Sequence, residues 1–226
     1  MRRIFALLLC LSLVPLPARG REIHYVALTF DDGPSGKYTR QLLDGLTQRD
    51  AKATFFLCGY RMKEYPDIAQ RIFDEGHEIG FHGYSHASMV SMSRRDIARE
   101  LMDSEALLPA GCHPVFLRPP GGCCSDALEQ VAKARLLSIL SWSVDPRDWA
   151  TGDALAVEKA VLETIGDGDI VLLHDMSASS VQAALDIVDV LQKRGVELVT
   201  VSQLAKLRGI TPRPGKVYRH FRPQAV

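Results

Sequence analysis

Short apolar runs rich in β-branched and aromatic residues alternate along this chain with segments of helical periodicity, and this alternation limits the possible folds most. The seven runs that we predict to be strands are Tyr25–Phe30, Thr54–Leu57, Glu78–Phe81, Val115–Leu117, Leu137–Trp142, Ile170–Leu173 and Glu197–Val201. Strands that alternate with helices are typical of βαβ units and a parallel sheet. We therefore predict an α/β fold in which each strand is followed by a helix.

The intervening segments carry signals for the ends of helices. Pro66 suits a first helical turn, where its missing N–H would have no partner. Ser93 can cap a helix that has Asp96 at its third position. The predicted helices are Tyr38–Arg49, a segment from Pro66 to Gly76, a segment from Ser93 to about Leu108, Ser125–Ala134, Asp153–Ile165 and Val181–Arg194.

Polar side chains gather directly after the predicted strands, at their carboxyl ends. These residues are Asp31 and Asp32 after the first strand, His82 and His86 after the third, Arg118 after the fourth, Asp145 and Asp148 after the fifth, and His174 after the sixth. Parallel β/α barrels build their active sites at this rim. Scattered surface residues would have no reason to collect there, so the sequence predicts an active site.

Two histidines and a carboxylate have the composition of a metal site. His82 and His86 are four residues apart, so one helical turn or a tight loop could direct both imidazoles at one ion. Asp31 and Asp32 repel each other beside a buried strand unless a cation compensates them. Two histidines with one carboxylate are typical of catalytic Zn²⁺, and the same set also holds non-haem Fe(II) in oxygenases. The alternatives are a solvated histidine loop and a plain Asp-Gly turn.

The first 20 residues have the pattern of a secretory signal peptide. A basic start precedes an apolar run from Ile4 to Leu16, and the small residues Ala18 and Gly20 mark a cleavage site. The run is shorter than the ~20 residues that a membrane-spanning helix needs. The alternative interpretation is a short N-terminal membrane anchor that is retained. We expect a secreted or periplasmic protein with no integral membrane segment in the mature chain.

The remaining chain is long enough for one domain. We expect a catalytic domain over residues 21–210 and a loosely attached, basic C-terminal extension over residues 211–226. The 27 basic residues balance the 27 acidic ones, so nothing indicates a nucleic-acid partner. We expect a monomer.

Five motifs in this order resemble the polysaccharide deacetylases of carbohydrate esterase family 4, which share the NodB homology domain. The motifs are Thr29-Phe30-Asp31-Asp32-Gly33, His82-x-x-x-His86, Arg118-Pro119-Pro120-Gly121-Gly122, Asp145-Pro146-Arg147-Asp148-Trp149 and Val171-Leu172-Leu173-His174. The resemblance extends from about Tyr25 to Leu207 and implies a distorted (β/α)7 barrel of the NodB type.

The resemblance also implies a metal centre and its base. Asp32, His82 and His86 would bind a divalent ion, most often Zn²⁺, with Co²⁺ and Ni²⁺ as possible substitutes. Asp31 would be the general base, and Arg118 would orient it.

The remaining motif residues would complete the site. Asp148 would hold His174 as a general acid for the leaving amine. Trp149 and Leu172 would line the pocket for the acetyl methyl group, and the Gly121 N–H would help hold the oxyanion.

Three positions depart from the pattern of the family. Gly83 stands where Ser or Thr often braces the histidine loop, Gly121 where an aromatic residue is common, and Pro146 is unusual within its motif. None of these changes removes a catalytic side chain, but the first two affect loop rigidity and the substrate groove.

The implied activity is removal of N-acetyl groups from N-acetylglucosamine-type polysaccharides, with peptidoglycan slightly ahead of chitin. Alternatives are a hydrolase of the same fold that acts on a small non-carbohydrate amide and an inactive carbohydrate-binding relative. In an oxidising compartment we expect Cys112 to pair with Cys123 or Cys124. Cys58 would pair with the remaining cysteine or stay buried.

Overall fold

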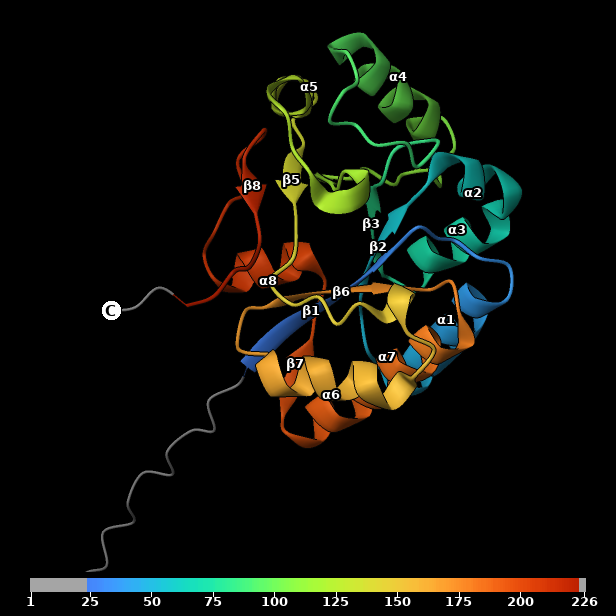
Figure 1. The fold of residues 1–226 in the computed structure, drawn as a ribbon, viewed down its shortest axis with the longest axis vertical. Helices are drawn as coiled ribbons and strands as arrows, with labels where there is room; N and C mark the ends of the chain where they lie inside the picture. The colour runs from blue at the N-terminus through green and yellow to red at the C-terminus, as the bar shows by residue number, and fades with distance from the viewer. Residues whose placement is uncertain (1–23, 224–226) are drawn as a thin grey trace, which may run out of the picture.

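Parallel strands form a sheet that curls into an incomplete barrel in the computed structural model, which describes residues 24–223 (Figure 1). The order is β6-β1-β2-β3-β4-β5-β8, and β7 pairs with β1 beside this path. The strands are β1 (His24–Asp31), β2 (Thr54–Leu57), β3 (Glu78–Phe81), β4 (Phe116–Leu117), β5 (Ser138–Leu140), β6 (Ile170–His174), β7 (Val196–Leu198) and β8 (Val217–Tyr218). The predicted α/β barrel class is confirmed.

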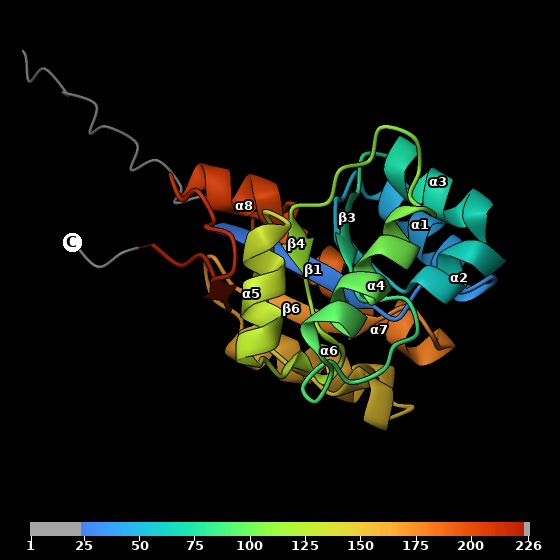
Figure 2. The same ribbon diagram turned by 90° about the horizontal axis from the view of Figure 1, so that it is seen from above.

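Helices cover the outside of the sheet, as two perpendicular views show (Figures 1 and 2). α6 packs on α7, α7 packs on α1, and α4 packs on α5. The α-helices are α1 (Tyr38–Gln48), α2 (Gly59–Glu64), α3 (Pro66–Asp74), α4 (Arg94–Glu105), α5 (Asp126–Ala134), α6 (Ala154–Thr164), α7 (Ala178–Lys193) and α8 (Val201–Leu207). Two 3-10 turns, η1 (Pro120–Gly122) and η2 (Asp148–Ala150), lie at the rim of the predicted site. None of the helices within residues 24–223 is long and apolar enough to cross a membrane.

The helix-end signals read from the sequence are confirmed where they were specific. Pro66 occupies the first turn of α3. The Ser93 hydroxyl accepts a hydrogen bond from the Asp96 N–H at 3.2 Å and caps α4. Capping satisfies backbone donors that a helix start otherwise leaves without partners.

Two helices and one strand boundary differ from the prediction. Val201 begins α8 instead of ending a strand, because Thr200 and Gln203 form a reciprocal capping box at that point. The short helix α2 follows β2 directly, where no helix was expected. A six-residue helix gives too little periodicity to be read from sequence alone.

The C-terminal segment is integrated into the fold, which corrects the expectation of a loosely attached extension. Strand β8 pairs in parallel with β5, so the sheet has an eighth strand beyond the seven predicted. Phe221 is buried and stacks on Tyr218, with the two ring centroids 5.4 Å apart. The predicted signal peptide lies outside the described residues.

The expected disulfide is also corrected, because all four cysteines of the described chain are free. Cys112 and Cys58 are buried, whereas Cys123 and Cys124 are exposed. Burial raises the pKa of the Cys112 thiol to about 11 and that of the Cys58 thiol well above its ordinary value. Both buried residues therefore behave as small apolar side chains.

Candidate active site

The polar residues that follow the strands meet in one pocket of about 440 Å³ at the carboxyl-end rim. Residues 31 and 174 are direct register partners on the neighbouring strands β1 and β6, so the sheet itself places Asp31 beside His174. The pocket is lined by Asp31, Asp32, His82, His86, Gly121, Trp142, Asp145, Trp149, Leu172 and His174. Arg118 and Asp148 stand behind this lining and contact Asp31 and His174.

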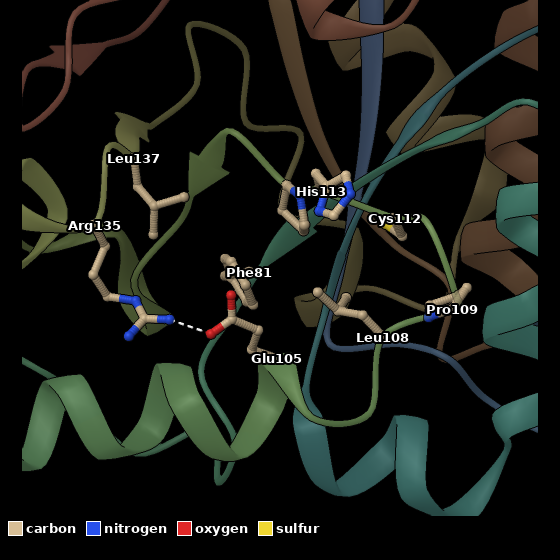
Figure 3. A pocket seen from close by; sticks show the side chains of 9 residues that line it. Phe81, Glu105, Leu108, Pro109, Cys112, His113, Arg135 and Leu137 are labelled. Atoms are coloured by element: carbon tan, nitrogen blue, oxygen red, sulfur yellow. Dashed lines mark hydrogen bonds and ion pairs between the residues drawn. The ribbon is translucent and has the colours of Figure 1, made fainter.

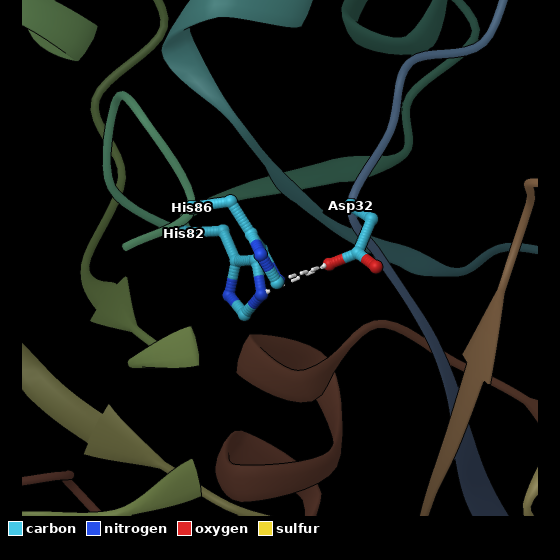
Figure 4. A group of neighbouring side chains, drawn as sticks. All are labelled: Asp32, His82 and His86. Carbon is cyan, nitrogen blue, oxygen red and sulfur yellow. Dashed lines mark ion pairs between the residues drawn. The ribbon is translucent and has the colours of Figure 1, made fainter. Parts of the chain in front are cut away.

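Asp32, His82 and His86 form a group whose possible ligand atoms all lie within 4.8 Å of one another (Figure 4). One carboxylate oxygen of Asp32 lies 3.2 Å from Nε2 of His82 and 2.9 Å from Nε2 of His86. Two imidazole nitrogens and a carboxylate oxygen that converge in this way fit a divalent metal ion with open coordination positions. The residues present therefore fit the metal centre that the sequence predicted.

The two histidines reach this group differently. His82 follows β3 and is buried. Its Nδ1 lies 2.7 Å from the Arg118 carbonyl oxygen, which accepts a hydrogen bond from the Nδ1–H group. This bond leaves Nε2 as the nitrogen that faces Asp32, the tautomer that metal binding requires. The His86 side chain is 43% exposed and comes from the loop beyond Gly83.

Asp32 and His86 both have left-handed backbone conformations, with φ of 72° and 62°. Non-glycine residues adopt this region uncommonly, although Asp and His do so more readily than most. Such conformations concentrate at functional sites, where the surrounding structure holds them.

The Asp32 carboxyl group faces two imidazole rings that favour its ionised form. Burial raises the pKa of the Asp32 carboxyl, but hydrogen bonds and charges from His82 and His86 outweigh burial and lower it well below its ordinary value. The hydrogen bond to Asp32 raises the pKa of His86, against the opposing effect of burial. The carboxylate is thus held ionised, the form that binds a metal.

Arg118 is fully buried and ties Asp31 to the barrel interior. Its Nη1 donates to Asp31 Oδ1 and to Thr29 Oγ1, each at 2.7 Å, and its Nη2 donates to the Ser141 carbonyl oxygen at 2.9 Å. The guanidinium carbon also lies 4.2 Å from the centre of the Phe56 ring. Burial lowers the pKa of Arg118, and the Asp31 carboxylate opposes that shift. Asp31 therefore keeps a fixed direction.

His174 is oriented by Asp148 through two contacts. Asp148 Oδ2 accepts from the His174 backbone N–H at 2.9 Å, and Oδ1 lies 2.8 Å from Nδ1 of the ring. Burial lowers the pKa of His174, but the hydrogen bond and charge of Asp148 outweigh burial and raise it to about 9. A protonated imidazole with Nδ1 occupied can donate its proton only from Nε2.

The predicted substrate-contact residues all lie at this pocket. Leu172 is buried in its floor, and Trp149 is 61% exposed at its rim, where Arg147 lies over the ring. Gly121 has φ of 72°, and a Cβ built there would meet no atom within 4 Å. The absent side chain thus leaves open space beside the site.

Sequence reasoning missed Trp142 as a pocket residue and assigned it to the predicted strand Leu137–Trp142. β5 ends at Leu140, so Trp142 lies past the strand end with the other rim residues. Its ring lies directly beneath Gly122, where an added Cβ would approach within 2.5 Å of it. A strand boundary two residues earlier would have placed Trp142 at the rim.

A second cavity, of about 290 Å³, contains none of the predicted site residues (Figure 3). Leu108, Cys112, His113 and Leu137 contribute to its lining, and the Arg135–Glu105 ion pair closes one side. His113 and Leu137 precede β4 and β5, so this cavity lies toward the amino ends of those strands. Its position is opposite to the rim used by parallel β/α enzymes.

The fold and the pocket define a class, that of parallel β/α-barrel enzymes with a candidate metal site at the carboxyl-end rim. A sequence profile described as polysaccharide deacetylase matches residues 18–137. The chain belongs to this family, the NodB-domain deacetylases of carbohydrate esterase family 4.

Individual relatives agree with this assignment. The chain is 38% identical over 189 residues to a peptidoglycan-N-acetylglucosamine deacetylase of Bacillus cereus, and the match covers 81% of this chain and 89% of that enzyme. It is 36% identical over 185 residues to the peptidoglycan-N-acetylmuramic acid deacetylase PdaC of Bacillus subtilis. That match covers 81% of this chain but only 39% of PdaC, so the chain spans well under half the length of that relative.

A solved structure with the same fold contains a metal. It is a family 4 acetyl xylan esterase of Clostridium thermocellum in complex with a cobalt ion. The TM-score is 0.81 at 34% sequence identity, and the match covers 87% of this chain and 98% of that one.

Proposed function

We propose that this chain is a metal-dependent N-deacetylase that hydrolyses the acetamido groups of N-acetylglucosamine-type polysaccharides and releases acetate. One observation carries the proposal: a fixed carboxylate, Asp31, and an oriented acid, His174, flank the Asp32–His82–His86 group in one pocket. A base, an acid and a Lewis-acid site are the parts that amide hydrolysis needs.

A bound metal would act as a Lewis acid, and side chains of this chain would carry out the proton transfers. A divalent ion held by Asp32, His82 and His86 would polarise the amide carbonyl and lower the pKa of water toward about 7. Asp31 accepts the proton of the attacking water. Because Oδ1 of Asp31 is bonded to Arg118, Oδ2 is the oxygen left for this proton, and it lies 3.9 Å from Nε2 of His82.

His174 then protonates the departing amine. Asp148 holds its Nδ1, so the proton leaves from Nε2, which is directed into the pocket with the other lining groups. Asp148 also keeps the imidazole charged before transfer, because it raises the pKa of His174 to about 9. The proton is therefore available when the carbon–nitrogen bond breaks.

Three further groups would hold the acetyl moiety. The Gly121 N–H would donate to the oxyanion, and loss of one such donor typically costs about 2.7–4 kcal/mol of barrier. Leu172 and Trp149 would enclose the methyl group between the pocket floor and its rim.

Zn²⁺ is the metal that we propose, with Co²⁺ and Ni²⁺ as replacements. Two imidazoles and one carboxylate are a usual ligand set for catalytic zinc. The similar acetyl xylan esterase of Clostridium thermocellum is in complex with a cobalt ion, which supports Co²⁺ as one of these replacements. Metal analysis of purified protein distinguishes zinc from the Fe(II) that the same ligands can hold.

Peptidoglycan is the substrate that we favour, ahead of chitin-like polymers. The names of the Bacillus relatives support this choice. The open space beside Gly121 would also admit a branched strand. We further propose that residues 1–20 are removed on export, and that the mature monomer acts outside the cytoplasm.

Acetate release per bound metal tests the function. The substrates are N-acetylglucosamine, its oligomers of increasing length, and purified peptidoglycan. We expect the monosaccharide to be poor, because contacts remote from the reacting bond help to lower the barrier. Equal rates on monosaccharide and polymer, or activity confined to a small non-sugar amide, would favour the alternative amidohydrolase. Binding of these glycans without acetate release would favour an inactive relative.

A further inference from the structure

The loop that carries His86 donates three hydrogen bonds to one carboxylate, which comes from outside the histidine motif. Glu100 lies in the middle of α4 and is half-buried. Its Oε2 accepts hydrogen bonds from the backbone N–H groups of Tyr84 and Ser85, at 2.7 and 2.8 Å. Its Oε1 accepts from the Ser85 hydroxyl at 2.8 Å. Three donors from the segment between the two histidines thus converge on one side chain.

The other polar groups of this loop are held by α2. The Gly83 carbonyl oxygen accepts from the Gly59 N–H at 2.9 Å, and the Tyr84 carbonyl oxygen accepts from the Tyr60 N–H at 3.0 Å. The loop therefore has its carbonyl groups fixed by the start of α2 and its amides fixed by Glu100. Removing the Glu100 carboxylate would leave two backbone N–H donors and one hydroxyl without their present acceptor.

Gly83 explains why the support must come from elsewhere. With φ of 79° and no side chain, it offers no hydroxyl to brace the loop. A Cβ at this position would lie 2.8 Å from Cε of Met89 and 3.2 Å from Oε2 of Glu100. The Glu100 carboxylate and Met89 thus fill the space that a side chain of residue 83 would need.

His86 depends on this loop more than His82 depends on it. The His82 ring is anchored by the Arg118 carbonyl oxygen and follows directly from β3. The His86 ring instead faces the other members of the metal-site group: its Nε2 lies 2.9 Å from Asp32, and its ring centroid lies 5.2 Å from that of His82. The position of the His86 backbone, which has φ of 62°, is therefore set by the segment that Glu100 holds.

We propose that Glu100 is a positioning residue for metal binding, which acts through the loop to keep His86 in place for the ion. The inference rests on the metal centre of the proposed function. Outer partners of metal ligands typically change metal affinity by about 10–100-fold when they are lost. Glu100 would act one step further out, on the backbone of the ligand loop, and we expect an effect at the lower end of that range.

The primary test is the dissociation constant of Co²⁺, measured by visible absorption on the full chain without substrate. Glu100→Met keeps the approximate length of the side chain but removes both acceptor oxygens, so the Tyr84 and Ser85 N–H groups and the Ser85 hydroxyl lose their common partner. We expect its Co²⁺ dissociation constant to rise about 10-fold. The matched control is Glu105→Met on the same helix, which loses an ion pair with Arg135 and should bind Co²⁺ as the unchanged protein does.

A double-mutant cycle separates positioning from general destabilisation. In a His86→Ala background, Glu100→Met should weaken Co²⁺ binding less than twofold further, because the ligand through which Glu100 acts is gone. In a His82→Ala background, the loss of about 10-fold should persist. Glu100→Asp keeps the charge but shortens the reach, and it provides a second variant with the same expected direction if Glu100→Met fails to fold.

The outcomes are distinct. Glu100→Met binding within twofold of the unchanged protein, or an undiminished loss in the His86→Ala background, would overturn the role of Glu100 and leave the metal centre intact. If the unchanged protein binds no Co²⁺, the metal centre of the proposed function is wrong, and the inference is overturned with it.

Discussion

The two sides of the pocket are built on different principles. On the β1–β6 side, Asp31 and His174 occupy paired positions of adjacent parallel strands, and each contacts one buried partner, Arg118 or Asp148. On the opposite side, His86 and Gly121 lie on turns with positive φ. Proton transfer thus relies on the rigid sheet, whereas metal binding and substrate entry rely partly on loops. Geometry on the loop side needs bracing from neighbouring helices.

The difference predicts that Asp31→Asn gives the largest loss of activity without loss of metal. The substitution removes the proposed base, and general acid–base groups contribute about 10²–10⁴-fold to the rate. Because Asp32 is the carboxylate that faces both histidines, metal content should stay near that of the unchanged protein. Acetate release and metal analysis of the same sample check this. Loss of the metal in Asp31→Asn would mean that the roles of the two aspartates are exchanged.

His174→Ala should lower kcat by a similar factor, about 10²–10⁴-fold, with a smaller change in KM. The imidazole acts as the amine departs, so its removal raises the barrier more than it weakens binding of the substrate. Steady-state kinetics on N-acetylglucosamine oligomers measure the two constants separately. A change confined to KM would assign His174 to binding.

Arg118→Met should destabilise the rigid side by about 3–5 kcal/mol, because it leaves the Asp31 carboxylate buried without its cation. Ser85→Ala on the loop side removes two exposed hydrogen bonds, one to Glu100 and one from the Ala87 N–H, and should change the free energy of unfolding by about 1 kcal/mol. Urea unfolding of both variants provides the comparison. Equal destabilisation would contradict the distinction between the two sides.

The pH profile gives a smaller effect with a defined sign. The acid must be protonated, so kcat should fall as pH rises through the pKa of His174, which Asp148 raises to about 9. In Asp148→Asn the raising charge is lost, while the lowering effect of burial remains. The alkaline limb of kcat should therefore move toward lower pH. A limb that stays in place would show that another group controls it.

The part of this organisation that follows local sequence could be predicted. Thr54–Leu57 and Glu78–Phe81 were predicted as strands with the observed boundaries, because each apolar run is bounded by polar or turn residues. The rim position of the motif residues followed from strand ends alone. The candidate site residues that directly follow a strand could therefore be identified from the sequence.

The part that depends on distant contacts could not be predicted. β8 is two residues long and gains its place from pairing with β5, about 80 residues earlier in the chain. In the sequence, Glu100 is one of several charged residues in a predicted helix, and nothing local distinguishes it. Its hydrogen bonds with Tyr84 and Ser85 depend on how α4 packs against the loop. The free cysteines likewise reflect tertiary placement, which spacing does not give.

Titration of metal-free protein with Zn²⁺, with acetate release from N-acetylglucosamine oligomers as the readout, tests the central claim most directly. We predict no turnover without metal, a linear rise in rate up to one equivalent of Zn²⁺, and no rise when His82 and His86 are both replaced by alanine. Full turnover by rigorously metal-free protein, or by the double variant, would contradict the account.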